Sequence, residues 1–185
     1  DRLRSRGLGD VYKRQVMIKS NELIFARINK DVKLPTKSHE NAGYDIYVYS
    51  DEEAITIPPH KTKMLPTGLY SACHPDYYIQ LVERGSTGSK GIAQRCGCID
   101  SGYRGEWFVP VTNTNSIPVI ITSDVEETQI LEDKILYPKT KAICQAVILP
   151  VPKMDVKEVS VSELKNIPSE LSLIHISEPT RPEPI

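Results

Sequence analysis

The chain has 185 residues and a formal net charge of −1, which allows one domain with a hydrophobic core. This balanced charge argues against a general nucleic-acid binder or a membrane-surface protein, because both classes carry a basic excess. No apolar run is long enough to span a bilayer, and the cysteines at positions 73, 96, 98 and 144 lack the spacing of a zinc site. We therefore expect a cytoplasmic protein with reduced thiols.

Residues 1–16 are rich in arginine and have no apolar periodicity. Within them, residues 10–15 resemble translated sequencing adapter, and so do residues 172–181 near the other end. Foreign segments of this kind are set aside when a fold is inferred. We predict a folded domain over residues 17–170, flanked by foreign segments at 1–16 and 171–185. The alternative is a basic disordered arm and a proline-rich tail.

Between these ends the chain reads as a series of short strands. Runs of β-branched and aromatic residues, separated by Pro, Gly, Asn and Asp, predict strands at 23–28, 45–49, 55–57, 77–82, 107–112, 118–122 and 142–149. This pattern indicates an all-β sandwich or barrel, and 14 prolines count against long helices. The charged segment 126–133 is compatible with a surface hairpin. A helix is expected only at 159–166, with Ser162 as its N-cap.

Two clusters before residue 93 are candidates for chemistry. In the segment 41–46, a glycine close to Asp45 permits a tight turn that exposes the carboxylate, although most such pairs are plain turns. The segment 83–92 holds three glycines, two cations and three hydroxyls, a composition suited to cradling phosphate. It lacks the order of a Walker loop, and a solvated flexible loop is the alternative.

The third cluster covers residues 94–107. Asp100 lies between an apolar strand and a Ser-Gly turn, where a carboxylate can reach a cleft and deprotonate a water molecule. A turn in which this aspartate only closes a hairpin is about as common.

Together with a fourth segment, these clusters are similar to the motifs of the trimeric dUTPases. Ala42-Gly43-Tyr44-Asp45 resembles A-G-x-D, and Arg84-Gly85-Ser86-Thr87 resembles P-R-S-S/G. The segment 98–105, Cys-Ile-Asp-Ser-Gly-Tyr-Arg-Gly, resembles G-V-I-D-x-x-Y-x-G, and 142–145, Ala-Ile-Cys-Gln, resembles R-I-A-Q. The four matches occur in the family's order, and the resemblance covers nearly all of residues 23–150.

The resemblance implies a distorted jelly-roll β-barrel that assembles as a homotrimer with shared active sites. The implied reaction is hydrolysis of dUTP to dUMP and pyrophosphate with Mg²⁺. The implied setting is the cytosol of a bacterium or of a phage-infected host. Neither nucleic acid nor a membrane is expected as a partner.

The resemblance also assigns roles to residues. Asp100 would activate the attacking water, and Tyr103 would pack under the deoxyribose. A hairpin from Gln94 to Ile99, including Cys98, would read uracil through backbone groups. The phosphates would be bound by Arg84, Gly85 and Ser86 with Gln145 nearby, and Asp45 would hold hydrated magnesium through water.

Three departures from the motifs are visible. Glu83 stands where the family often has Pro, and Gly85 stands where many members place a phosphate-binding Ser. The glycine-rich fifth motif, which closes over the phosphates, is not found before residue 171. We therefore expect this chain to hydrolyse dUTP poorly.

Three alternatives stay open. A dCTP deaminase shares the fold but needs a glutamate base near the cytosine amine. A regulatory or interaction protein with this fold would use the charged segment 122–140 as its partner surface. A sandwich module without catalysis would require all four motif matches to be coincidence.

Overall fold

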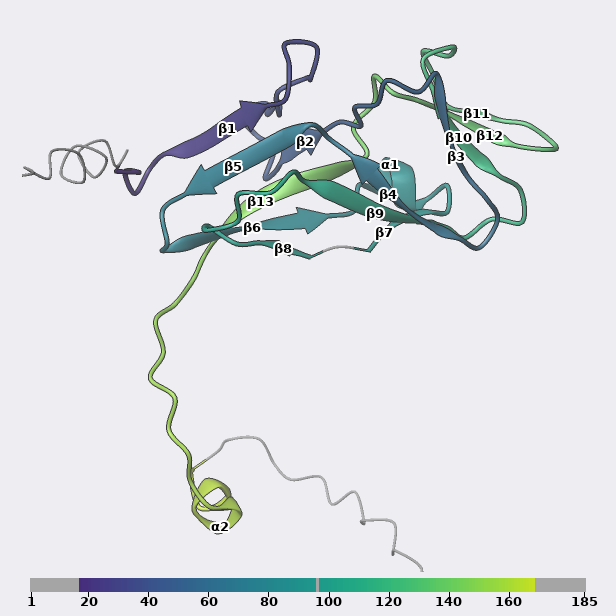
Figure 1. The fold of residues 1–185 in the computed structure, drawn as a ribbon. Helices are drawn as coiled ribbons and strands as arrows, with labels where there is room; N and C mark the ends of the chain where they lie inside the picture. Colours follow the sequence, from purple (N-terminus) through teal and green to yellow (C-terminus); the bar gives the residue numbers. More distant parts are fainter. Residues whose placement is uncertain (1–16, 96, 169–185) are drawn as a thin grey trace, which may run out of the picture. The chain divides into compact units, whose positions relative to one another are not determined.

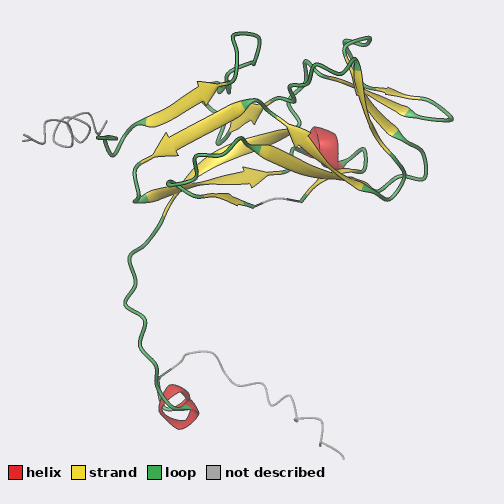
Figure 2. Ribbon diagram, viewed as in Figure 1, coloured by secondary structure: helices red, strands yellow, loops and turns green. Residues whose placement is uncertain are grey.

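The structure is a computed structural model that describes residues 17–95 and 97–168. The predicted foreign segments, 1–16 and 171–185, lie outside these residues. Strands are the main regular elements of the described chain, joined by long loops (Figures 1 and 2). They are β1 (Leu23–Arg27), β2 (Tyr44–Ile46), β3 (Ala54–Ile57), β4 (Thr62–Pro66), β5 (Leu69–Cys73), β6 (Tyr77–Val82), β7 (Ile92–Gln94), β8 (Cys98–Ile99), β9 (Phe108–Asn113), β10 (Val119–Thr122), β11 (Gln129–Ile130), β12 (Ile135–Pro138) and β13 (Cys144–Pro150).

The strands form small sheets whose neighbours are distant in the sequence. The sheets have the strand orders β2-β13-β6-β8, β4-β9-β7, β11-β12-β10-β3 and β1-β5. Within these sheets the pairing is antiparallel except between β10 and β12. The all-β architecture predicted from the sequence is confirmed.

The core forms where alternating side chains of these sheets meet. In β9, Val109, Val111 and Asn113 are buried while Phe108 is exposed, as expected for a strand with one face on the core. Trp107 is fully buried and meets the Phe25 ring edge to face, with ring centroids 5.5 Å apart. Apolar burial of this kind is the main stabilising contribution.

The helical prediction was right in place but wrong at its start. The chain divides into two compact units between Pro152 and Lys153, and α2 (Val161–Lys165) belongs to the second. Ser160, rather than Ser162, is the N-cap: its hydroxyl accepts a hydrogen bond from the Glu163 backbone N–H, and the Glu163 carboxylate accepts one from the Ser160 backbone N–H. This reciprocal capping box satisfies donors that a helix start leaves free.

The charged segment that begins near residue 126 forms a hairpin. β11 and β12 pair antiparallel, and the Leu131 N–H donates to the Lys134 carbonyl across the turn. The predicted hairpin therefore exists, but its second strand, β12, lies beyond the predicted segment 126–133. Within the described part of the chain, no helix has both the length and the apolar character needed to cross a membrane.

Candidate active site

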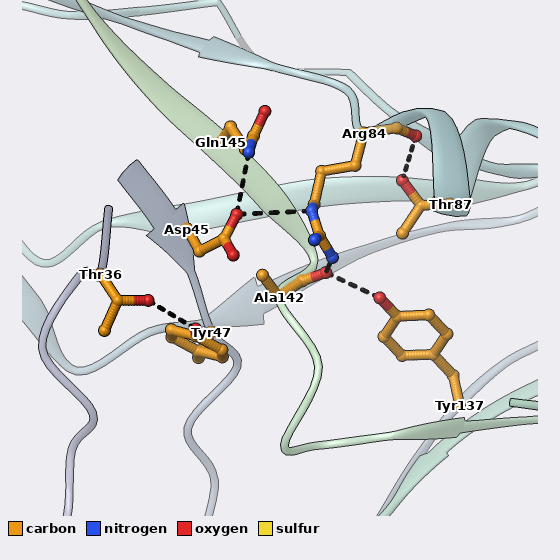
Figure 3. Close-up of polar contacts among 8 residues, drawn as sticks. All are labelled: Thr36, Asp45, Tyr47, Arg84, Thr87, Tyr137, Ala142 and Gln145. Carbon is orange, nitrogen blue, oxygen red and sulfur yellow. Dashed lines mark hydrogen bonds and ion pairs between the residues drawn. The ribbon is translucent and has the colours of Figure 1, made fainter. Parts of the chain in front are cut away.

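Asp45 and Gln145 meet across two paired strands. β2 and β13 run antiparallel with these two residues opposite each other, and Gln145 Nε2 donates to Asp45 Oδ1 at 2.9 Å (Figure 3). Gly43 makes the close approach possible, because a Cβ at that position would lie 3.1 Å from the Gln145 Cβ. The glycine and the aspartate of the first motif therefore both contribute to the contact with Gln145 of the fourth motif.

Arg84 joins this pair from the end of β6. Its Nε lies 3.5 Å from Asp45 Oδ1, and the two side chains are only 25% and 22% exposed. Its Nη1 donates to the Ala142 carbonyl at 3.0 Å, and the Tyr137 hydroxyl donates to the same carbonyl at 2.7 Å (Figure 3). Residues of the first, second and fourth motifs thus form one hydrogen-bonded network.

Burial raises the pKa of the Tyr137 phenol, because its charged form would lose hydration. The Arg84 guanidinium acts in the opposite direction, while the charges of Asp45 and Cys144 reinforce the rise in pKa. Tyr137 therefore stays a neutral hydrogen-bond donor to Ala142.

This network borders a pocket, here called the cationic pocket, of about 320 Å³, lined among others by Asp45, Arg84, Ser86, Lys90 and Lys141. The described lining residues include three cations and one carboxylate, so the pocket suits an anionic ligand. Ser86 lies in α1 (Gly85–Gly88), a single helical turn. Gly85 is exposed in the same turn but does not line the pocket.

The glutamate that replaces the motif's proline has a structural role. Glu83 Oε2 accepts a hydrogen bond from the Gln94 backbone N–H at 3.0 Å. Its other oxygen lies so close to Gly88 that a Cβ there would be 2.3 Å away. Glu83 therefore connects β7 to the loop that contains α1. At position 88, only glycine fits without displacing the Glu83 side chain.

Asp100 opens a tight turn directly after β8. The Tyr103 N–H donates to the Asp100 carbonyl at 3.0 Å, which closes the turn. Arg104 Nη1 donates to the carbonyls of Ser101 at 2.7 Å and Ser71 at 3.2 Å, and so ties the turn to β5. Sequence reasoning missed Arg104, although its place inside the third motif was a signal.

Asp100 and Tyr103 line a second pocket, here called the apolar pocket, of about 190 Å³ with Cys98, Ile99 and Phe108 among its walls. Tyr103 is 43% exposed, and its hydroxyl donates to the Glu106 carbonyl at 3.0 Å. A Cβ at Gly105 would lie 2.4 Å from that hydroxyl oxygen, so glycine is needed for the ring to fold back. A flat, half-apolar ligand suits these walls.

The expected hairpin from Gln94 to Ile99 is wrong. β7 pairs with β9, whereas β8 pairs with β6, so the described residues of this segment cross from one sheet to another. The hairpin was expected only from the resemblance to the family motifs, whereas in this structure each of the two short strands pairs with a strand outside the segment. Gln94 lines neither pocket, and Cys96 lies outside the described residues.

Among the described residues, the two pockets have no lining residue in common. Asp45, Arg84 and Ser86 line the first, and Cys98, Ile99, Asp100 and Tyr103 line the second. Within one chain the predicted residues therefore come together as two separate groups.

The described residues contain no group of three or more His, Cys, Asp or Glu side chains that could hold a metal ion. Asp45 is the one carboxylate among the described residues that line the cationic pocket, and its Oδ1 already accepts from Gln145. This donor set is too small to chelate Mg²⁺ directly. It fits only a hydrated ion whose other ligands are water and phosphate oxygens.

The dUTPase family profile matches residues 30–144 of the chain. The chain belongs to the dUTPase family. It is 32% identical over 142 residues to the deoxyuridine 5′-triphosphate nucleotidohydrolase of Clostridium kluyveri, a match that covers 75% of the chain and 86% of that protein.

Two solved dUTPases have the same fold. The first is the dUTPase of Staphylococcus bacteriophage 80alpha with dUpNHpp, from a description of how phage dUTPases control transfer of virulence genes. It matches with a TM-score of 0.59 at 22% identity, and the match covers 75% of the chain and 88% of that structure. A mutant dUTPase from phage phi11 of S. aureus, with a structural Mg(II) ion, gives 0.58 at 21% identity and covers 75% and 97%. The jelly-roll fold predicted from the sequence is confirmed.

Proposed function

We propose that the chain hydrolyses dUTP to dUMP and pyrophosphate, with the base and sugar in the apolar pocket and the phosphates in the cationic pocket. The observation that supports this most directly is the partition of the four motifs. Cys98, Ile99, Asp100 and Tyr103, implied for base and sugar, line a small apolar pocket, whereas Arg84 and Ser86, implied for phosphates, line a cationic one. A nucleoside triphosphate has the same two halves.

In the proposed reaction, Asp100 accepts a proton from a water molecule as the water oxygen attacks the α-phosphorus. The bond from that phosphorus to the bridging oxygen breaks, and the electron pair leaves with pyrophosphate. Asp100 suits this role because the turn closed by Tyr103 and tied down by Arg104 fixes its backbone. Catalysis is then a matter of positioning and electrostatics, and no covalent intermediate is needed.

Arg84 and Ser86 would bind the phosphates, with Gln145 acting through Asp45. When Mg²⁺ is bound with the triphosphate, it neutralises the charge that repels the nucleophile. Asp45 would contact the hydrated ion through water, and the dUTPase of phage phi11, which has the same fold, also contains a structural Mg(II) ion. The proposed setting is the cytoplasm.

A homotrimer with shared sites would join the two pockets. Because the pockets share no lining residue in the described part of one chain, the apolar pocket of one chain would face the cationic pocket of the next. A cyclic trimer repeats such a contact until the ring closes.

Asp100→Asn tests the proposed mechanism. The amide keeps the shape of the side chain but cannot accept the proton, so we expect pyrophosphate release from dUTP with Mg²⁺ to fall by about 100-fold or more. Asp133→Asn, in the β11–β12 hairpin outside both pockets, should keep the wild-type rate. A wild-type rate in Asp100→Asn would refute the mechanism, and ammonia release from dCTP would indicate a deaminase instead.

We also propose that this 185-residue chain closes poorly over its substrate. Its last glycine is Gly105, so the sequence after that residue holds no glycine-rich fifth motif. Closure of such a segment removes water and adds donors in the transition state. Adding a glycine-rich arm after Glu170 should raise turnover by about tenfold or more, and an unchanged turnover number would reject the idea.

A regulatory role is the second candidate. The hairpin of β11 and β12 exposes Ile130 (65%) and Leu131 (40%). The structurally similar dUTPase of bacteriophage 80alpha is described as one of the phage dUTPases that control transfer of virulence genes. If this hairpin serves a partner, Asp100→Asn should keep partner binding while hydrolysis is lost. Loss of both would favour the enzyme alone.

A further inference from the structure

Lys141 lies in the wall of the cationic pocket but outside the four motifs. It immediately precedes Ala142, the position where the family's fourth motif begins with arginine, so this chain lacks that motif cation. The ammonium of Lys141 instead forms an ion pair with Glu127, which the segment before β11 contributes. Lys141 thus places a positive charge at the pocket from a neighbouring position.

The backbone that carries Lys141 is well fixed. Its own N–H donates to the Pro138 carbonyl at 3.1 Å. The next carbonyl, that of Ala142, accepts hydrogen bonds from Arg84 and Tyr137. The base of the side chain is therefore held at the pocket, while its four-carbon stem leaves the ammonium free to change partner.

The charges of the pocket favour such a change. Arg84 already has Asp45 as its counter-ion, and the Lys90 ammonium donates to the Ser86 carbonyl. The partner of Lys141 is weaker, because the Glu127 side chain is 80% exposed and the Lys141 side chain is 35% exposed. A solvent-exposed pair of this kind contributes little to stability, so a phosphate oxygen can replace the carboxylate at small cost.

We infer that Lys141 is a phosphate-binding residue of the cationic pocket and that Glu127 competes with the phosphates for its ammonium. A polyphosphate chain, such as the one dUTP carries, displaces the Glu127 carboxylate and takes its place. This inference rests on the proposed function for the identity of the nucleotide, but the phosphate contact itself depends only on the pocket.

The probe is inorganic pyrophosphate, titrated calorimetrically into the 185-residue chain at low salt. Lys141→Gln removes the charge, Lys141→Arg keeps it, and Glu127→Gln removes the competitor. The matched control is Lys134→Gln, because Lys134 pairs with Asp133 at 3.7 Å in the neighbouring hairpin and lines neither pocket. Thermal melting of each variant shows whether the fold is intact.

We expect Lys141→Gln to raise the dissociation constant of pyrophosphate about tenfold, the effect of one charge-assisted contact. Lys141→Arg should stay near wild type, Glu127→Gln should lower the constant about threefold, and Lys134→Gln should leave it unchanged. Equal losses in Lys141→Gln and Lys134→Gln would overturn the inference, because only general charge would then be involved. Unchanged binding in Lys141→Gln, or no binding of pyrophosphate to the wild-type chain, would overturn it too.

A separate assay of dUTP hydrolysis distinguishes this inference from the proposed function. If the wild-type chain hydrolyses dUTP while Lys141→Gln binds pyrophosphate normally, only the inference is rejected. If pyrophosphate binding depends on Lys141 but dUTP is not hydrolysed, the inference holds and the proposed reaction is rejected.

Discussion

At the scale of single residues, Arg84 combines a structural and a binding role. Its guanidinium contacts Asp45 and the Ala142 carbonyl, which join β2, β6 and the segment before β13. A guanidinium has five N–H donors, so these contacts leave donors for a phosphate. Removing Arg84 would therefore change the shape of the pocket as well as its charge.

Tyr137 gives a prediction of pH dependence. Because burial raises the pKa of this phenol above 10.0, the folded state holds the proton more tightly than the unfolded state. Its contribution to stability is complete below pH 10.0 and is lost as the pH rises through the raised pKa. We expect the free energy of unfolding to decline more steeply above that pH in the wild-type chain than in Tyr137→Phe, as measured by urea denaturation.

Tyr137→Phe also loses the hydrogen bond to Ala142, which should lower stability at neutral pH by about 1 kcal/mol. Tyr70→Phe provides the comparison, since Tyr70 is only half-buried on β5. Parallel pH profiles for wild type and Tyr137→Phe would contradict the assigned role of this phenol.

At the scale of elements, the strands that the sequence analysis missed are those that form only through pairing with a partner strand. β5, Leu69–Cys73, was not predicted, because Ser71 is polar although it is buried in the structure. β4, Thr62–Pro66, carries an exposed Met64 and also escaped prediction. Strand propensity measures fit to a half-buried surface rather than a property of the backbone, so such strands form through their partners.

The β8 strand offers a chemical test of the apolar pocket. Cys98 is exposed and lines that pocket, whereas Cys73 and Cys144 are buried. Burial raises the pKa of the Cys73 thiol, with Arg104 as a weaker opposing influence, so the reactive thiolate is scarce there. In a Cys96→Ser chain we expect Cys98 alone to react rapidly with a thiol reagent at pH 8.

Saturating dUMP should slow the reaction of Cys98 by about tenfold or more, because a bound base would cover its sulfur. Mass spectrometry of the modified peptides would assign the rates to each cysteine. Equal rates for Cys98 with and without dUMP would show that the nucleotide does not occupy this pocket.

At the scale of the whole molecule, the proposed trimer can be tested by mixing inactive chains. Asp100→Asn would damage the apolar pocket, and Arg84→Gln would damage the cationic one. If each site combines pockets from two chains, co-refolded mixtures should recover about a quarter of the wild-type rate of pyrophosphate release. A mixture that stays inactive, from variants that melt normally and form trimers, would indicate that each site lies within one chain.

The sequence by itself determined the family and the all-β class, and its motifs named some of the residues that line the two pockets, because these depend on local patterns and short motifs. It failed to predict that β7 and β8 have different partners. It also did not predict that Arg84 and Gln145 both contact the same carboxylate oxygen of Asp45.

Only the tertiary structure decided these points, because Asp45 and Gln145 are separated by 100 positions. A contact over such a distance is set by the register of β2 against β13, and register depends on how both strands bury their apolar faces. The same packing places Asp100 and Arg84 in different pockets, the apolar and the cationic one. The motifs alone do not predict this separation.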